Sequence, residues 1–199
     1  MLSHPGFRYA ASGLRTTQNR VSNPNLRKLG KSREALVMQW QEVIDDPVLS
    51  ELPYKIELNK WGLIEMSPAS NRHGIVQSRI LRFLAKHLTI GEAFVECSIA
   101  TPAGVKVADV VWCSPQFLEQ HGEQTPYLAA PEICIEVLSP SNRAQVIAEK
   151  VALYLNQGAT EVWLVDEQGS IEIYGHDGKR GNSSFVEQLP TIFASRAGP

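Results

Sequence analysis

Lys150 occupies an unusual position for a lysine, inside the apolar arc of a predicted helix. If residues 143–157 are helical, successive side chains step about 100° around the axis, and Lys150 falls inside one apolar arc. The arc is formed by Val146, Ile147, Val151, Leu153, Tyr154 and Leu155. A lysine that points into a core needs a negative partner, because an unpaired buried charge is very costly. The sequence therefore predicts an acidic partner within the fold.

Two carboxylates upstream could be that partner. Alternation along a strand over 105–113 places Asp109 as the lone acid on an apolar face, and Glu136 is an acid deep within the next apolar run. Taken singly, each acid would favour a place near a strand end, exposed or paired with Lys150 or Arg143. Both acids together with an inward lysine favour a functional site.

Paired acids of this kind suit metal-dependent hydrolysis. Two carboxylates a few ångströms apart repel and raise each other's pKa, and a hard divalent cation relieves that repulsion. Such an ion polarises a phosphate, lowers the pKa of a bound water and orients the attack. We therefore expect Asp109 and Glu136 to bind Mg²⁺ or Mn²⁺. Lys150 would place or deprotonate the water, or stabilise charge on phosphorus.

A helix from about 71 to 90 adds two polar side chains to the same region. Its periodicity places His73 and Gln77 on the face that carries Ile80 and Leu84, so both are expected to point toward the sheet. The alternative for the histidine is a core position satisfied by a backbone carbonyl. A separate arc is basic and is either a solvated face or a phosphate contact: Arg72, Arg79, Arg82 and Lys86.

The remaining patterns predict an α/β domain, or an α+β domain, with a mixed sheet. The central order is helix, three strands, helix, strand, with hairpins added at both ends. Residues 114–131 are expected to form a loop. The predicted helices are 34–44, 71–90 and 143–157, and the predicted strands are 54–58, 63–66, 93–99, 105–113, 132–138, 161–166, 170–174 and 185–189.

Composition indicates one globular domain over 31–195, preceded by a basic tail. The chain has 199 residues, 43% of them apolar, which is enough for a sizeable core. Residues 1–30 lack periodicity and are expected to be disordered; a leader from an early start codon or an organellar transit peptide are the alternatives. No apolar run approaches the roughly 20 residues that span a membrane, and no secretory signal is recognised, so we expect a cytoplasmic protein. Three cysteines in strand-like runs are expected to be reduced core thiols: Cys97, Cys113 and Cys134.

The charge is distributed unevenly. Residues 1–33 hold seven of the 19 Lys and Arg residues and no acid. The other 12 basic residues accompany 21 acidic ones, so residues 34–199 carry a net charge of −9. This balance excludes broad, non-specific binding to nucleic acid and requires a local basic patch or a bound cation for any contact with DNA or RNA.

Several short motifs follow one another in order between Trp40 and Leu189. They are K-I-E-L-N-x-x-G at 55–62, M-S-P-x-S at 66–70 followed by His73, A-D-V-V-W at 108–112, E-V-L-S-P-S at 136–141, E-K-x-x-L-Y at 149–154 and V-W-L-V-D at 162–166. Together they resemble the bacterial putative restriction endonuclease family, a branch of the PD-(D/E)xK nuclease superfamily. The resemblance covers about three quarters of the chain.

This resemblance implies a restriction-endonuclease-like core and an endonuclease that hydrolyses DNA phosphodiester bonds with a divalent metal. It implies Asp109 and Glu136 as the metal ligands. The superfamily lysine normally follows the glutamate by two positions, where this chain has Leu138, and Lys150 on the next helix matches its replacement. His73 matches the family histidine.

The same resemblance implies two further site residues and leaves an alternative function open. Glu57 matches an acid in the hairpin before the first core helix, and Gln77 stands where the superfamily often has a glutamate. Many relatives carry an acid four residues before the lysine, where this chain has Val146. These departures and the acidic charge favour the alternative function. In that alternative, the chain is a degenerate nuclease fold that binds nucleic acid or a protein and does not cleave nucleic acid. The added hairpins could pair their edges in a homodimer.

Overall fold

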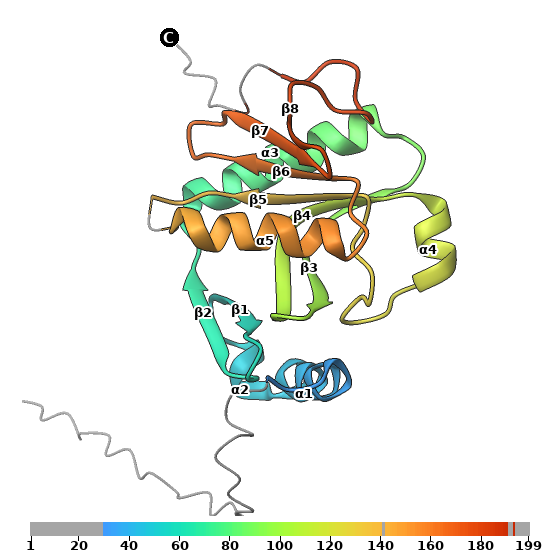
Figure 1. The fold of residues 1–199 in the computed structure, drawn as a ribbon. Helices are drawn as coiled ribbons and strands as arrows, with labels where there is room; N and C mark the ends of the chain where they lie inside the picture. The colour runs from blue at the N-terminus through green and yellow to red at the C-terminus, as the bar shows by residue number, and fades with distance from the viewer. Residues whose placement is uncertain (1–29, 141, 191–192, 194–199) are drawn as a thin grey trace, which may run out of the picture.

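A mixed sheet forms the centre of the computed structural model, which describes residues 30–140, 142–190 and 193 (Figure 1). Six strands lie in the order β3-β4-β5-β6-β7-β8, and every neighbouring pair is antiparallel except β5 and β6. Helix α5 (Ala144–Asn156) connects this parallel pair, as such a crossover requires. The strands are β3 (Glu92–Thr101), β4 (Gly104–Cys113), β5 (Ile133–Val137), β6 (Glu161–Val165), β7 (Ile171–Gly175) and β8 (Gly178–Arg180).

Helices cover both faces of this sheet. The α5 residues Ile147, Val151 and Tyr154 pack with side chains of β3 to β6 in one apolar cluster. On the other face, helix α3 (Asn71–His87) contributes Val76 and Ile80 to a second cluster. Because both faces are covered, every residue of β4, β5 and β6 is buried.

A hairpin and two helices cover one end of β4. Strands β1 (Tyr54–Leu58) and β2 (Ile64–Pro68) pair only with each other, so they form a separate two-stranded sheet. In Figure 1 this hairpin lies below the main sheet, beside α1 (Arg33–Asp45) and α2 (Pro47–Ser50). A third apolar cluster holds these elements together: Leu36, Trp40, Val43, Leu58, Val105 and Val107.

The predicted fold class is confirmed, and three local predictions are wrong. Helix α4 (Pro115–His121), capped by the Ser114 hydroxyl, lies within the expected loop. The predicted strand at 185–189 does not form, because its apolar side chains pack against the α3 face without joining the sheet. Strand β8 (Gly178–Arg180) lies between β7 and that segment in the chain and pairs with β7 instead.

Further predictions concern the end of α1, the cysteines, the N-terminal tail and membrane-spanning segments. At the end of α1 the Asp46 carboxylate accepts from the N–H groups of Val48 and Leu49, so it starts α2 rather than a loop. All three cysteines are buried free thiols, as expected. The tail expected over 1–30 lies outside the described residues except for Gly30. No described helix is long and apolar enough to cross a membrane.

Candidate active site

Asp109 and Glu136 come from adjacent strands and face the same point. The β4–β5 register pairs Val110 with Ile135, and extending it by one residue places Asp109 opposite Glu136. At this position the Asp109 Oδ2 accepts from the Val137 N–H at 2.7 Å, so the side chain takes the place of a ladder bond. Both carboxylates are buried, with 1% and 4% of the residue exposed.

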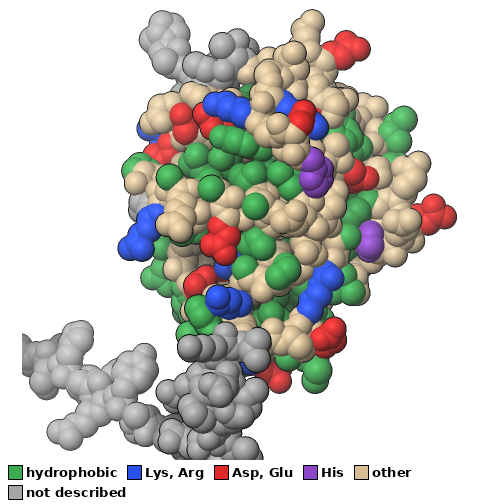
Figure 2. All heavy atoms as spheres, in the orientation of Figure 1, with side chains coloured by type: hydrophobic (Ala, Val, Ile, Leu, Met, Phe, Trp, Pro, Cys, Tyr) green, Lys and Arg blue, Asp and Glu red, His purple; other side chains and the backbone are tan. Residues whose placement is uncertain are grey.

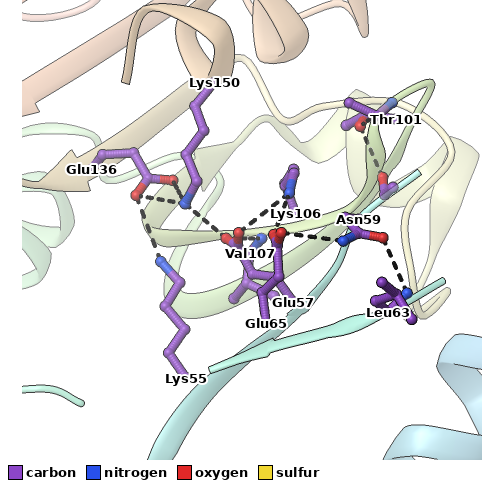
Figure 3. A network of polar contacts seen from close by, with 12 residues as sticks. Lys55, Glu57, Asn59, Leu63, Glu65, Thr101, Lys106, Val107, Glu136 and Lys150 are labelled. Atoms are coloured by element: carbon purple, nitrogen blue, oxygen red, sulfur yellow. Dashed lines mark hydrogen bonds and ion pairs between the residues drawn. The ribbon is translucent and has the colours of Figure 1, made fainter. Parts of the chain in front are cut away.

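Lys55 of the β1–β2 hairpin joins the two carboxylates. Its Nζ lies 2.6 Å from Asp109 Oδ1. The same Nζ lies 3.6 Å from Glu136 Oε2 (Figure 3). Sequence reasoning did not assign this lysine to the site. The available signal was that Lys55 and Glu57 share one face of the strand, but that pattern is also typical of a solvated hairpin.

Lys150 has the acidic partners that its position predicted. Its Nζ donates to Glu57 Oε1 at 2.7 Å and lies 3.2 Å from both carboxylate oxygens of Glu136. The predicted apolar arc is wrong at its beginning, because Val146 is 48% exposed and the buried residues of α5 begin at Ile147. Arg143 is also exposed and has no ion pair among the described residues.

Tyr154, one helical turn after Lys150, is a further residue that sequence reasoning missed. Its hydroxyl donates to Glu136 Oε1 at 2.7 Å, and the side chain is fully buried. The spacing of four residues puts it on the same helix face as the lysine. Glu136 is therefore held from α5 at two points.

Glu57 also docks the hairpin onto the main sheet. Its Oε1 accepts from the Val107 N–H at 3.0 Å, and its Oε2 lies 3.7 Å from the Lys106 Nζ. Lys106 in turn contacts Glu65 of β2 at 3.2 Å. Figure 3 shows these groups as one continuous polar network between hairpin, sheet and α5.

Helix α3 brings His73 and Gln77 to Asp109 from the other side. The His73 Nε2 lies 3.3 Å from Asp109 Oδ1, so the alternative of a histidine bound to a backbone carbonyl is wrong. Gln77 Nε2 donates to the Asp109 carbonyl oxygen at 3.3 Å and to Glu96 Oε1 at 3.0 Å. The Ser70 hydroxyl accepts from the His73 N–H and fixes this first turn.

Comparison with known proteins supplies a family. The model of the Uma2 family, described as putative restriction endonuclease, matches residues 42–197, which is more than half of the chain. The chain belongs to this family. Its fold is similar to the crystal structure of a putative nuclease from Anabaena variabilis, with a TM-score of 0.57 and 18% sequence identity over 69% of this chain and 87% of that one. A comparison with curated protein sequences gives no match.

The contacts keep Asp109 and Lys55 of this Uma2 protein charged. Burial alone would raise the pKa of Asp109, but the charge of Lys55 and the hydrogen bond with His73 hold that pKa well below its ordinary value. Burial alone would lower the pKa of Lys55, yet the charges of Glu136 and Asp109 keep it well above the ordinary range. Their contact is therefore an ion pair at neutral pH.

Around Lys150, the pKa values of both Glu136 and Lys150 are raised. Burial raises the pKa of Glu136 in spite of the nearby charges of Lys150 and Lys55. Burial alone would lower the pKa of Lys150, but Glu136 and Glu57 raise it above its ordinary value. In this arrangement Lys150 acts as a hydrogen-bond donor to both carboxylates.

The donors partly fit the divalent cation that the fold family implies. Asp109 and Glu136 offer one oxygen each to a shared point, and hard oxygen donors suit Mg²⁺ and Mn²⁺, with waters completing the shell. Within the described part of the chain, no three His, Cys, Asp or Glu side chains gather as a metal centre. The Lys55 ammonium occupies the position between the two carboxylates.

Glu96 has a strained backbone directly opposite Asp109. The β3–β4 register runs through Val95–Val110 and Cys97–Ala108, and the intervening pair is Glu96 and Asp109. Glu96 has φ 57°, a left-handed conformation that costs a residue with a Cβ roughly 1–2 kcal/mol. Such strain is typical of functional sites.

We expect Glu96→Gly to be more stable than Glu96→Ala by about 1 kcal/mol, because glycine adopts φ 57° without strain. Both variants lose the hydrogen bond from Gln77, so that contribution cancels. Urea denaturation measures the difference. Glu92, exposed on the same strand with an ordinary φ, is the control, and there alanine should be the more stable. Equal stability of the two Glu96 variants would show that no strain is stored.

Proposed function

We propose that this Uma2 protein is a nuclease that hydrolyses DNA phosphodiester bonds with Mg²⁺ or Mn²⁺. The observation that carries the proposal is the convergence of Asp109 and Glu136, from adjacent strands, on one cation position beside Lys150. The family and the fold of a solved putative nuclease support the same reaction class.

In this proposal Asp109 and Glu136 hold the cation, which when bound would polarise the phosphate and lower the pKa of a water. The Val137 N–H orients Asp109, and Tyr154 orients Glu136. Lys150, as an ammonium next to Glu136, donates to the attacking water or to the phosphate oxygen on which charge develops.

His73 and Gln77 act on Asp109 rather than on the substrate. The imidazole contacts Asp109 Oδ1, and the hydrogen bond raises the pKa of His73. Gln77 fixes the Asp109 carbonyl. His73 thus keeps the carboxylate from rotating when its other partners change, and Gln77 holds the backbone that carries it, which is the role of groups that support a metal ligand.

The DNA backbone would approach beside the first turns of α3. A groove of about 990 Å³ there is lined by Ala69, Ser70 and a face of α3 that carries Arg79 and Arg82 but not His73 or Gln77. Arg82 and Lys86 are exposed, whereas Arg79 donates to the Phe193 carbonyl oxygen. On the face seen in Figure 2, basic side chains are scattered among acidic and apolar ones, so a local contact on α3 suits the acidic domain better.

A binding module without catalysis is the second candidate. It is favoured by the pairing of three buried lysines with three buried carboxylates, Glu57, Asp109 and Glu136, which balances charge without a metal. Homodimer formation and a cytoplasmic location stay predictions.

Metal titration tests the proposal. We expect Mg²⁺ or Mn²⁺ to raise the thermal midpoint, since a ligand at about 100 times its Kd stabilises a fold by roughly 2.7 kcal/mol. Supercoiled plasmid should be nicked or linearised in the same buffers and stay intact with chelator. Plasmid that binds but stays intact at millimolar Mg²⁺ and Mn²⁺ would favour the binding module, and the absence of any metal effect on stability would reject the metal site.

A further inference from the structure

We propose that the Lys55 ammonium is the resident cation of this site and competes with the divalent ion for the same carboxylate oxygens. This inference rests on the proposed function, because it describes how the metal would enter. It assigns Lys55 a role that sequence reasoning did not give it: Lys55 determines how strongly the free protein binds metal.

The first support is position. Lys55 Nζ contacts Asp109 Oδ1 at 2.6 Å and lies 3.6 Å from Glu136 Oε2, and its side chain is 12% exposed. These are the oxygens that a divalent ion bridging the two acids would use. An ammonium and a metal ion cannot both occupy that point, because they need the same lone pairs and repel each other.

The second support is that Lys55 belongs to a separate element. Asp109, Glu136 and Lys150 lie on strands and a helix whose apolar sides are buried in the main core. Lys55 lies on β1, which pairs only with β2, and every residue of β2 is exposed. The element that carries this ammonium is thus attached to the main sheet by side-chain contacts and not by strand pairing.

The third support is an alternative place for the ammonium. Lys55 also lines a groove of about 840 Å³ between the hairpin, α1 and β3. Glu92, Glu96 and Glu123 line the same groove, so it offers negative charge at its rim. A lysine side chain has four rotatable methylene carbons, and a change in its rotamers carries the charge from the carboxylate pair into this groove.

The net charge of the site couples the binding of the metal to the binding of the substrate. With Lys55 in place, the buried lysines and carboxylates of the network balance. Replacing a monovalent ammonium by a divalent ion adds one positive charge, which a substrate phosphate neutralises. Metal should therefore bind weakly to the free protein and more tightly when a phosphodiester is present, and by linkage metal should strengthen the binding of the phosphodiester equally.

Calorimetric titration of Mn²⁺ into the protein without DNA tests the competition. We expect Lys55→Met to bind Mn²⁺ about tenfold or more tightly than the wild type, because the competing charge is gone. In chelator the variant should melt at a lower temperature, since two buried carboxylates lose a partner, and Mn²⁺ should restore it. Lys55→Gln, which keeps a donor for Asp109 but lacks the charge, serves if the methionine variant folds poorly.

The matched control is Lys106→Met. Lys106 is as buried as Lys55 and belongs to the same network, but it contacts Glu57 and Glu65 instead of Asp109. Its removal should change Mn²⁺ affinity much less. Asp109→Ala added to Lys55→Met should abolish the tighter binding, which locates the ion.

The possible failures are distinguishable. Equal Mn²⁺ affinity in the wild type and both Lys55 variants, with binding that still depends on Asp109, overturns the competition and leaves the metal site intact. An equal gain in Lys55→Met and Lys106→Met also overturns it, because the effect would then be general charge. Absence of Mn²⁺ binding even without Lys55 overturns both the competition and the proposed metal-dependent nuclease.

Discussion

Asp109→Asn is expected to abolish metal-dependent cleavage of DNA, with a fall of about 10³-fold or more in the single-turnover rate. The substitution removes the negative charge that faces Lys55 and the proposed cation, while the amide oxygen can still accept from the Val137 N–H. The β4–β5 junction is thereby preserved. The rise in thermal midpoint on adding Mn²⁺ should disappear together with cleavage.

Two further variants test whether the loss of cleavage is due to the Asp109 carboxylate itself. Asp45→Asn, at the exposed end of α1, removes the same charge far from the network and should cleave like the wild type. Asp109→Ala should lose activity equally and be less stable than Asp109→Asn by about 1–3 kcal/mol, because the Val137 N–H is then buried without its partner. Cleavage retained by Asp109→Asn would contradict the proposed role of this carboxylate.

The parts of the site that sequence could reveal share one property. Asp109, Glu136 and Lys150 are charged residues at positions where the periodicity of a strand or helix demands an apolar side chain. Such a conflict is visible locally, without knowledge of any tertiary contact. The same holds for the main strands and helices, whose long periodic runs determine the fold class.

The missed parts depend on tertiary contacts. In β1 the missed Lys55 alternates with apolar residues, which is also the pattern of a hairpin with one face in water; Glu57 beside it was indicated only by the family resemblance. Only the docking of that hairpin onto β4 converts the polar face into a buried network. The left-handed backbone of Glu96 likewise has no signal in residue type, because glutamate rarely adopts it.

The same difference between local sequence pattern and tertiary contact explains why the strand predicted at 185–189 does not form. The apolar residues Phe185, Val186 and Leu189 suggest a strand, and their side chains do pack against the α3 face. The segment packs without strand pairing, because side-chain pattern carries no information about where backbone N–H groups find partners.

Lys150→Met is expected to lower both stability and activity, and separating the two requires a second substitution. The methionine keeps the apolar stem but leaves Glu57 and Glu136 without their shared ammonium, which should cost about 3–5 kcal/mol. A loss of cleavage in this variant alone would not distinguish catalysis from charge balance. Lys150→Ala would add a cavity and is less informative.

Glu57→Gln combined with Lys150→Met resolves the question. The amide removes one of the two negative charges that Lys150 had paired and can still accept from the Val107 N–H, so much of the lost stability should return in urea denaturation. If Lys150 donates to the reacting groups, single-turnover cleavage should stay about 10²–10³-fold below that of Glu57→Gln alone. Recovery of cleavage together with stability would mean that Lys150 only neutralises the acids. Because the contacts of Lys150 reach Glu57 on the hairpin and Glu136 on the sheet, this pair of variants tests whether one ammonium has both a structural and a chemical role.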